Sequence, residues 1–317
     1  MVAVSASAPG KIILFGEHAV VYGQPAIAAP LTAVQVTVTA EPGPPGGGLV
    51  IHAAALGQTV AAAQVAPDSP FFDALVYPAQ LLLEHLRAPM PDLRLTVRST
   101  IPVASGLGSG AALATAIMRA LAAALGARLP DDALNPLVYE VEKRHHGTPS
   151  GIDNTVIVYA RPVYFVRGKA PQTFAVARPF TLLVADSGQS SPTRLTVADV
   201  RRLHDADAPR LDGLFARIGE IVRAARQSIE TGDLDSLGPL MDENHALLRE
   251  LTVSSELLDR LCQAARDAGA RGAKLSGGGR GGTIIALVDE ADAAPVTAAL
   301  RQVGAVRVLS TRIEQSP

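Results

Sequence analysis

The hydrophobic pattern of the chain predicts an α+β protein. Glycine and proline separate short apolar runs in the first half of the sequence, and we expect strands from Val2 to about Val97 before the first long helix. Runs rich in β-branched residues predict individual strands at Val34–Val38, Leu93–Val97, Val156–Val158 and Val163–Val166.

Two helices are predicted in the middle of the chain. Alanine-rich sequence with high helix propensity runs from Ser109 to Leu125, and Gly126 provides a stop. A second helix is predicted from Asp131 to His145, because apolar residues recur there at helical spacing.

The pattern of apolar residues changes in the second half of the chain and indicates another domain. After a predicted strand at Thr181–Ala185, helical periodicity dominates to about Gly269, and strands at Thr283–Val288 and Val306–Ile313 flank a helix around Ala291–Val303. The length of 317 residues exceeds the usual size of one compact core. We therefore expect two domains, residues 1–175 and 176–317.

Composition and charge exclude several classes of function. A net charge of −2, with neither a basic block nor a zinc pattern, makes nucleic acid an unexpected partner. The N-terminus lacks the basic start and apolar stretch of a signal peptide, and no segment resembles a membrane span, so we expect a cytoplasmic protein without a membrane partner. The single cysteine, Cys262, has apolar helical neighbours, which predicts a buried core residue.

A glycine-rich segment, IPVASGLGSGAA from Ile101 to Ala112, opens the first long helix. The free N–H groups and positive dipole end of a helix N-terminus bind phosphate, and glycines let the backbone approach the anion. Gly106 and Gly108 also fit a dinucleotide pattern, but Asp131, at the required spacing, begins a helix. No Gly-Lys-Ser/Thr follows, as a Walker loop requires. Taken alone, the segment also fits a tight turn before a core helix.

Two further glycine motifs stand near the ends of the chain. Pro9–Gly23 reads PGKIILFGEHAVVYG, and Gly272–Gly282 reads GAKLSGGGRGG. With the central segment, they resemble the three motifs of the GHMP kinases, in the same order. The segments EKRHHGTPSGIDN, ADSGQSSPTRLTVADVRRL and MDENHALLRELTVSSELLDRL resemble the mevalonate kinase family within that superfamily. The resemblance spans nearly the whole chain.

The resemblance implies a fold, an activity and a set of ligands. The fold would be the two-domain GHMP kinase fold, with a ribosomal-protein-S5-like, ATP-binding N-terminal domain and a ferredoxin-like C-terminal domain. The activity would be phosphorylation of the mevalonate 5-hydroxyl in isoprenoid precursor biosynthesis, with ATP as phosphoryl donor and Mg²⁺ as cofactor. A homodimer is among the partners expected, and the sequence does not fix the oligomeric state.

The resemblance also assigns roles to individual residues. Asp153 is the expected base facing the substrate hydroxyl, with Lys11 as the cation beside it, and an ammonium there would stabilise both the carboxylate and the developing alkoxide. Glu17 and His18 are expected near the substrate, with His18 donating to its carboxylate. Glu142 is the expected magnesium ligand, for which one carboxylate suffices. The expected ATP-binding residues are Ser99, Ala104, Ser105, Gly106, Leu107, Gly108, Ser109 and Gly110.

Two positions depart from the usual family pattern. Gly110 stands where a serine usually reaches Mg²⁺, so the neighbouring Ser109 is the remaining hydroxyl candidate for the metal. Arg280 interrupts a run that is more often all glycine, and an arginine there has the chemistry to meet phosphate or a carboxylate.

Simpler interpretations and other functions stay open. Glu142 also fits an exposed helix residue paired with Lys143 or Arg144, and Asp153 a turn former; we expect His145 and His146 to be structural. Another GHMP kinase, acting on homoserine, phosphomevalonate or a sugar, would keep all three glycine motifs. A related ATP-dependent decarboxylase would lack this form of the first motif, and a non-catalytic relative would have lost Lys11 or Asp153.

Overall fold

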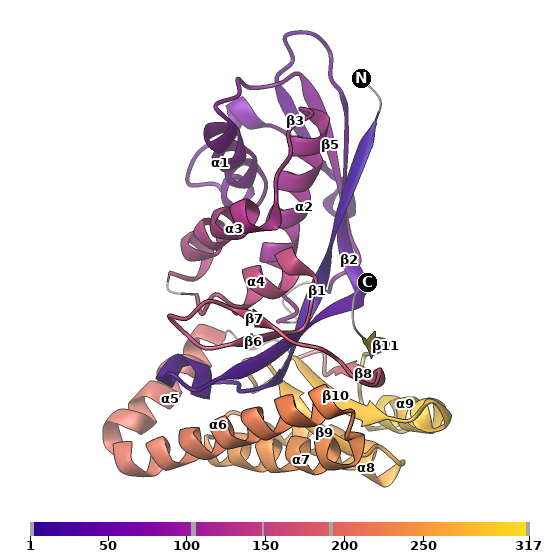
Figure 1. Cartoon of the computed structure of the whole chain (residues 1–317). Helices are drawn as coiled ribbons and strands as arrows, with labels where there is room; N and C mark the ends of the chain where they lie inside the picture. Colours follow the sequence, from indigo (N-terminus) through magenta and orange to yellow (C-terminus); the bar gives the residue numbers. More distant parts are fainter. Residues whose placement is uncertain (1–2, 103–105, 148, 190–192, 315–317) are drawn as a thin grey trace. The chain divides into compact units, whose positions relative to one another are not determined.

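The computed structural model describes residues 3–102, 106–147, 149–189 and 193–314, which form two compact units (Figure 1). The first unit combines Met1–Gly10, Val34–Val103 and Gly108–Ala160, and the second combines Lys11–Ala33, Ala104–Leu107 and Arg161–Pro317. Each unit is thus assembled from segments far apart in the sequence. The boundary near residue 175 stays a prediction about the domains.

Strands of the first unit follow the period-two pattern of half-buried sheets. Strand β3 (Leu49–Ala53) pairs in parallel with β5 (Leu93–Ser99) and antiparallel with β4 (Gln58–Ala61). β5 pairs on its other side with the end of β2 (Ala26–Pro42), where Val38 lies opposite Val97. Alternate residues of β3, β5 and the end of β2 are buried, as their apolar pattern predicts.

The described part of the first unit also contains the α-helices α1 (Tyr77–Leu86), α2 (Ser109–Ala124), α3 (Asp131–His146) and α4 (Ile152–Tyr159). α2 packs against the other three, which explains why its small side chains are buried around the whole helix. The predictions of α2 and α3 are confirmed to within one residue at each end. The predicted strand Val156–Val158 is wrong, because these residues lie inside α4.

The four-stranded sheet of the second unit has the order β11-β8-β10-β9, and all neighbours are antiparallel. Its strands are β8 (Phe180–Asp186), β9 (Gly272–Ser276), β10 (Thr283–Val288) and β11 (Arg307–Ile313). The three strands predicted in this half are confirmed. β9 was not predicted, because it lies within the last glycine motif. Strand β6 (Val163–Phe165) joins the start of β2 to β7 (Gln172–Thr173).

Helices cover one face of this sheet. α7 (Leu234–Glu250) packs on β9, α8 (Glu256–Asp267) on β9 and β10, and α9 (Ala293–Val303) on β8 and β11. α5 (Thr193–Ala206) precedes α6 (Ala208–Thr231), which lies along α7 (Figure 1). Short helical turns lie at Ala19–Tyr22, Ala54–Leu56, Ala62–Gln64, Phe72–Val76 and Glu290–Asp292, and β1 runs from Val4 to Phe15.

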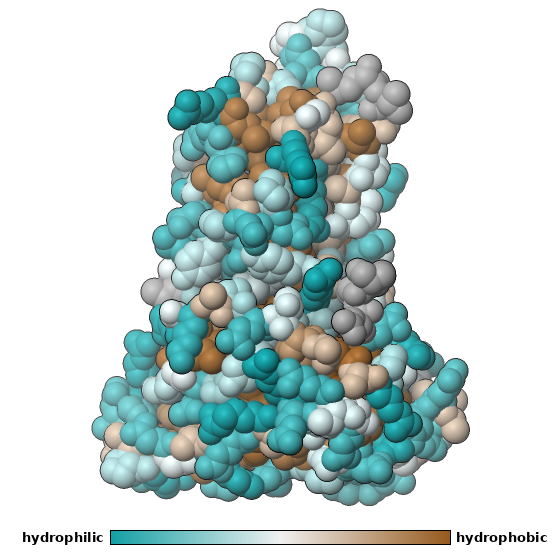
Figure 2. Space-filling view, viewed as in Figure 1, coloured by the Kyte–Doolittle hydropathy of each residue, from teal (hydrophilic) through white to brown (hydrophobic). Residues whose placement is uncertain are grey.

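The exposed surface of the helical layer is polar, and its inner side is apolar. Figure 2 shows mainly hydrophilic residues over α6 and α7, where Arg217 pairs with Glu220 and Glu243. Cys262 is fully buried on α8, as predicted, and burial raises the pKa of its thiol. No helix among the described residues has the length and apolar character needed to cross a membrane.

α7 and β9 approach each other through two glycines. A Cβ on Gly238 would lie 2.1 Å from the Arg271 carbonyl oxygen, and a Cβ on Gly272 would lie 2.2 Å from the Gly238 carbonyl oxygen. Real side chains do not tolerate such distances, so the close packing of helix on strand depends on both glycines. Gly213 lies on the exposed side of α6, and a Cβ there would have no atom of another element within 4 Å.

We predict opposite effects for the same substitution at these two helical glycines. Gly238→Ala should lower the free energy of unfolding by about 1–3 kcal/mol, because the added methyl group separates α7 from β9. Gly213→Ala, the matched control, should raise it by up to about 1 kcal/mol through helix propensity alone. Urea unfolding of both variants tests this, and a shift in the same direction for both would contradict the packing account.

Candidate active site

The glycine-rich segment ends at the N-terminus of α2, as predicted. Gly106 and Gly108 have φ angles of 74° and 75°, a region that favours glycine, and Gly108 is the N-cap of the helix. No described side chain caps this helix start, and its first turn holds no acidic residue. The free N–H groups and the helix dipole therefore make this end of α2 suitable for an anion.

The other residues predicted to bind ATP lie close in sequence to the start of this helix. Ser109 is the first residue of α2 and is exposed. Ser99 ends β5, and its hydroxyl accepts a hydrogen bond from the Ile101 N–H at 3.1 Å, which fixes a local turn. Leu107 is buried. The predicted residues Ala104 and Ser105 lie outside the described part of the chain.

Glu142 lies on α3 beside the start of α2. Its side chain is buried, so the interpretation as an exposed helix residue is wrong. Its Oε1 atom is 3.1 Å from the position that a Cβ on Gly110 would occupy. A side chain at position 110 would therefore meet the Glu142 carboxylate directly, and the carboxylate would have to shift slightly to accept it.

Asp153 lies in the first turn of α4, which begins after Gly151 in the left-handed region at φ 89°. A carboxylate in this position interacts favourably with the helix dipole. The neighbouring Asn154 is buried and donates from Nδ2 to Asn135 Oδ1 at 2.7 Å, which fixes α4 against α3. Asp153 is half-exposed at the end of this anchored helix.

Lys11, on β1 in the second unit, is connected to the central glycine segment. Its side chain is 5% exposed, and its backbone N–H donates to the Leu107 carbonyl oxygen at 2.9 Å. The first and second motifs, nearly a hundred residues apart in sequence, thus share a backbone hydrogen bond.

A tight turn follows β1 at Gly16, Glu17 and His18. Gly16 has φ 97°, and a Cβ there would lie 2.5 Å from the Pro25 carbonyl oxygen. His18 also adopts a left-handed φ of 60°, which is rare for a residue other than glycine and marks a backbone that its surroundings hold in place.

Glu17 is buried and forms an ion pair with Lys274 on β9, whose side chain is also fully buried. Lys274 Nζ donates in addition to the Leu275 carbonyl oxygen at 2.7 Å. Burial raises the pKa of Glu17 and lowers the pKa of Lys274, and the charge of each partner opposes the shift of the other. The sequence patterns did not point to Lys274 as a functional residue. The one feature that could have done so is a charged residue between apolar neighbours in the segment GAKLS.

His18 Nε2 lies 3.0 Å from the Gly278 carbonyl oxygen and is therefore the nitrogen that carries the proton. Burial lowers the pKa of His18 to about 4, so the ring is neutral near pH 7. A neutral ring has no second N–H, so in this arrangement its Nδ1 is unable to donate to a substrate carboxylate. The assignment of His18 as a substrate residue stays a prediction.

Arg280 forms contacts within the second unit. Its guanidinium pairs with Asp199 on α5, and its Nε donates to the Thr252 carbonyl oxygen at 3.0 Å. The residue has φ 56°, and neighbouring Gly279 passes so close to Val253 that a Cβ would lie 1.9 Å from its carbonyl oxygen. Arg280 thus holds the last glycine loop to the helical layer.

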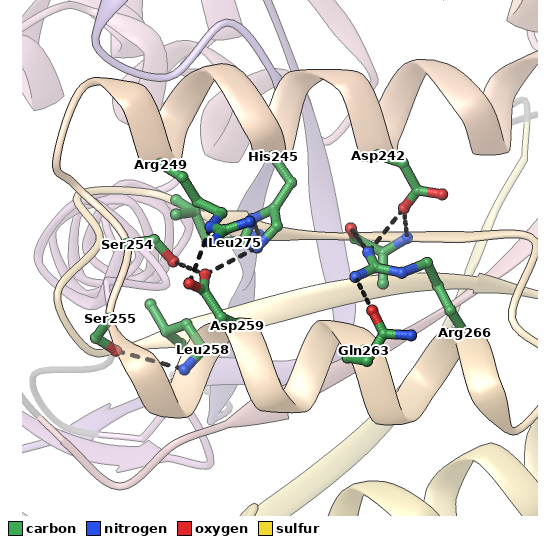
Figure 3. Close-up of polar contacts among 11 residues, drawn as sticks. Asp242, His245, Arg249, Ser254, Ser255, Leu258, Asp259, Gln263, Arg266 and Leu275 are labelled. Atoms are coloured by element: carbon green, nitrogen blue, oxygen red, sulfur yellow. Dashed lines mark hydrogen bonds and ion pairs between the residues drawn. The ribbon is translucent and has the colours of Figure 1, made fainter.

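The free edge of β9, which carries Lys274, is bonded to side chains of the helical layer (Figure 3). Asp242 accepts from the Ala273 N–H at 2.9 Å, and one turn later on α7, His245 Nδ1 accepts from the Leu275 N–H at 3.3 Å. His245 Nε2 lies 3.1 Å from Asp259 on α8. These contacts replace a neighbouring strand and fix the strand that precedes the last glycine loop.

The described residues contain no cluster of three or more histidine, cysteine or carboxylate side chains that would hold a metal ion. The side chains of His145 and His146 lie outside the described part of the structure. One carboxylate with phosphate oxygens and water is the coordination that Mg²⁺ prefers, and Glu142 beside the α2 N-terminus is compatible with it.

Comparison with known proteins agrees with this geometry. Residues 74–161 match the family model of the GHMP kinases N terminal domain, and residues 222–306 match that of the GHMP kinases C terminal domain. The mevalonate kinase of Thermococcus gammatolerans is 35% identical over 312 residues, which cover 93% of this chain and 92% of that protein.

Solved mevalonate kinases have the same fold. The L. major mevalonate kinase in complex with R-mevalonate superposes with a TM-score of 0.84 at 30% identity, covering 99% of this chain and 96% of that one. The Methanococcus jannaschii mevalonate kinase gives a TM-score of 0.87 at 25% identity, with 99% of both chains covered. The chain therefore belongs to the mevalonate kinase family of the GHMP kinases.

Proposed function

We propose that this protein is a cytoplasmic mevalonate kinase that transfers the γ-phosphoryl group of ATP to the 5-hydroxyl of mevalonate in isoprenoid precursor biosynthesis. The observation that carries the proposal is similarity over 93% of the chain to a mevalonate kinase, combined with 30% identity to a mevalonate kinase that binds R-mevalonate. Three glycine motifs in the order typical of these kinases support it.

The roles that the family resemblance gives to the residues agree with what phosphoryl transfer requires. The substrate oxygen forms a bond to the γ-phosphorus, the bond to the ADP oxygen breaks, and the hydroxyl proton moves to a base. Asp153 is the proposed acceptor of that proton, and Lys11 the proposed cation that stabilises the developing alkoxide. The glycine segment and the α2 N-terminus would bind the ATP phosphates through backbone N–H groups.

Magnesium fits the residues at the start of α2. Glu142 would hold the ion, with Ser109 as a second candidate ligand from the exposed first position of the helix. Bound Mg²⁺ would neutralise charge on the phosphate oxygens. Glu142 Oε1 lies 3.1 Å from the Cβ position of Gly110, so the carboxylate is the anionic group adjacent to the missing serine.

Acceptor specificity tests the proposed function directly. We expect kcat/KM for ADP release with mevalonate to exceed that with phosphomevalonate, homoserine or galactose by at least about tenfold. An acceptor with a different arrangement of polar groups would leave buried polar groups of the site unpaired. A coupled ADP-release assay with these four compounds provides the comparison. If the enzyme prefers one of the other three compounds, that compound and not mevalonate is its substrate.

Removal of the proposed base should affect chemistry and leave ATP binding intact. Asp153→Asn should lower kcat by about 10²–10⁴, the usual range for general-base assistance, with little change in ATP affinity. Lys11→Met should also lower kcat, and the double variant should lose less than the product of the single effects, because the two groups act together.

Glu256→Gln is the matched control for these kinetics, because it removes a carboxylate from the first turn of α8. Its kcat should equal that of the wild type. The assignment of Asp153 as the base fails if Asp153→Asn keeps more than about a tenth of wild-type kcat, well above the general-base range.

Substitution of Gly110 gives a test of metal ligation. Gly110→Ser adds a hydroxyl that is expected to reach the ion, so it should lower the Mg²⁺ concentration for half-maximal activity. Gly110→Ala is the control, since it brings the same Cβ to 3.1 Å from Glu142 Oε1 without the hydroxyl. Its Mg²⁺ requirement should be unchanged or higher. Identical behaviour of the two variants, in activity and in Mn²⁺ titration of the ATP-bound protein, would rule out hydroxyl ligation at this position.

A further inference from the structure

Three contacts connect the first glycine motif to the last one within the second unit. Ser276 Oγ accepts from the Ile13 N–H at 3.1 Å and donates to the Ile13 carbonyl oxygen at 2.9 Å. Lys274 pairs with Glu17, and His18 donates to the Gly278 carbonyl oxygen. Two of these contacts, at Glu17 and His18, hold the turn at Gly16–His18 to β9 and the loop after it, and the third holds the strand that leads into the turn.

The contact between Lys274 and Glu17 differs from the other two, because it buries two charges. Lys274 Nζ lies 5.8 Å from the centre of the Phe15 ring and has the Glu17 carboxylate and one carbonyl oxygen as acceptors. Glu17 Oε2 is buried without a hydrogen-bond partner among the described residues. The carboxylate therefore depends strongly on the ammonium of Lys274, and moving the turn away from β9 would leave a buried charge uncompensated.

We propose that Lys274 is a positioning residue for acceptor binding: its ion pair with Glu17 fixes the Gly16–His18 turn, and so determines how the first motif presents His18 and Lys11 to the acceptor alcohol. Glu17 then acts by holding the turn, and it does not contact the substrate. The inference rests on the proposed function for the identity of the acceptor. ATP binding, assigned to the start of α2, does not depend on this pair.

Kinetics of three variants test the positioning role. Lys274→Met should raise the KM for mevalonate by about tenfold or more, because a displacement of about 1 Å in a binding group has effects of this size or larger. The KM for ATP should stay within about twofold of the wild-type value. The double variant Glu17→Gln/Lys274→Met should keep the raised KM for mevalonate, because the connection between turn and strand is still missing. Arg260→Met, which removes the exposed ion pair with Glu256 on α8, is the control and should change neither KM.

The pH dependence of stability separates the ion pair from simple packing. In Lys274→Met, the buried Glu17 has lost its counter-ion, so its pKa rises further in the folded protein. A group with a raised folded pKa contributes stability at low pH that is lost as the pH increases. The melting temperature of this variant should therefore fall more steeply than that of the wild type between about pH 5 and pH 8. The double variant should lose this extra slope.

Other titratable groups near the pair are common to the compared variants. Lys11 on β1 lowers the pKa of Glu17, and His245 on α7 and Cys262 on α8 interact with Lys274. Lys274→Met and the double variant share all three, so their difference in slope reports Glu17 alone.

Each outcome decides between the alternatives. If Lys274→Met raises both KM values equally, or leaves the KM for mevalonate unchanged, the positioning role is overturned. If the melting temperature of this variant falls with pH no more steeply than that of the wild type, the dependence of Glu17 on Lys274 is overturned. If Lys274→Met does not fold, the double variant, which has no uncompensated charge, carries the kinetic test. If the wild type does not phosphorylate mevalonate, the proposed function fails, while the melting comparison and the same kinetics with the preferred acceptor still test the pair.

Discussion

The buried ion pair between Lys274 and Glu17 is the interaction on which the arrangement of the first and last motifs depends. Breaking a buried pair by removing one partner costs about 3–5 kcal/mol, yet replacing both partners by apolar residues is often neutral or stabilising. Net stability is therefore a poor explanation for the pair. Its geometry offers a better one, because Lys274 and Glu17, 257 residues apart in sequence, meet only when the turn after β1 lies against strand β9.

The strand that carries Lys274 is itself held by an unusual set of partners. β9 is the edge of its sheet, and its outward N–H groups at Ala273 and Leu275 donate to Asp242 and to a neutral His245 (Figure 3). Lys274 donates a hydrogen bond to the Leu275 carbonyl oxygen, and Arg266 donates one to the Ala273 carbonyl oxygen at 3.3 Å. Hydrogen bonds and ion pairs thus connect α8 to β9, and β9 to the first motif. The position of the Gly16–His18 turn therefore depends on the helical layer.

Sequence patterns predicted the elements whose signal is local. The alanine-rich helix α2 and the strands of the second half follow directly from propensity and period. The run Val156–Val158 was misread because three β-branched or aliphatic residues favour a strand, whereas burial against α2 and α3 makes them helical in α4. The pairing of Glu17 with Lys274, 257 residues apart, has no local signal. The roles of Glu142 and Asp153 stay predictions from the motifs. The close approach of Glu142 to Gly110 depends on how α3 packs against α2, which no local pattern shows.

A crystal structure with R-mevalonate and a non-hydrolysable ATP analogue tests the central claim, that Glu17 holds the first motif while Asp153 and Lys11 meet the acceptor. The account predicts that the Glu17 carboxylate remains on Lys274 and that the 5-hydroxyl lies within hydrogen-bond distance of Asp153. A Glu17 side chain that has left Lys274 to contact mevalonate would contradict it.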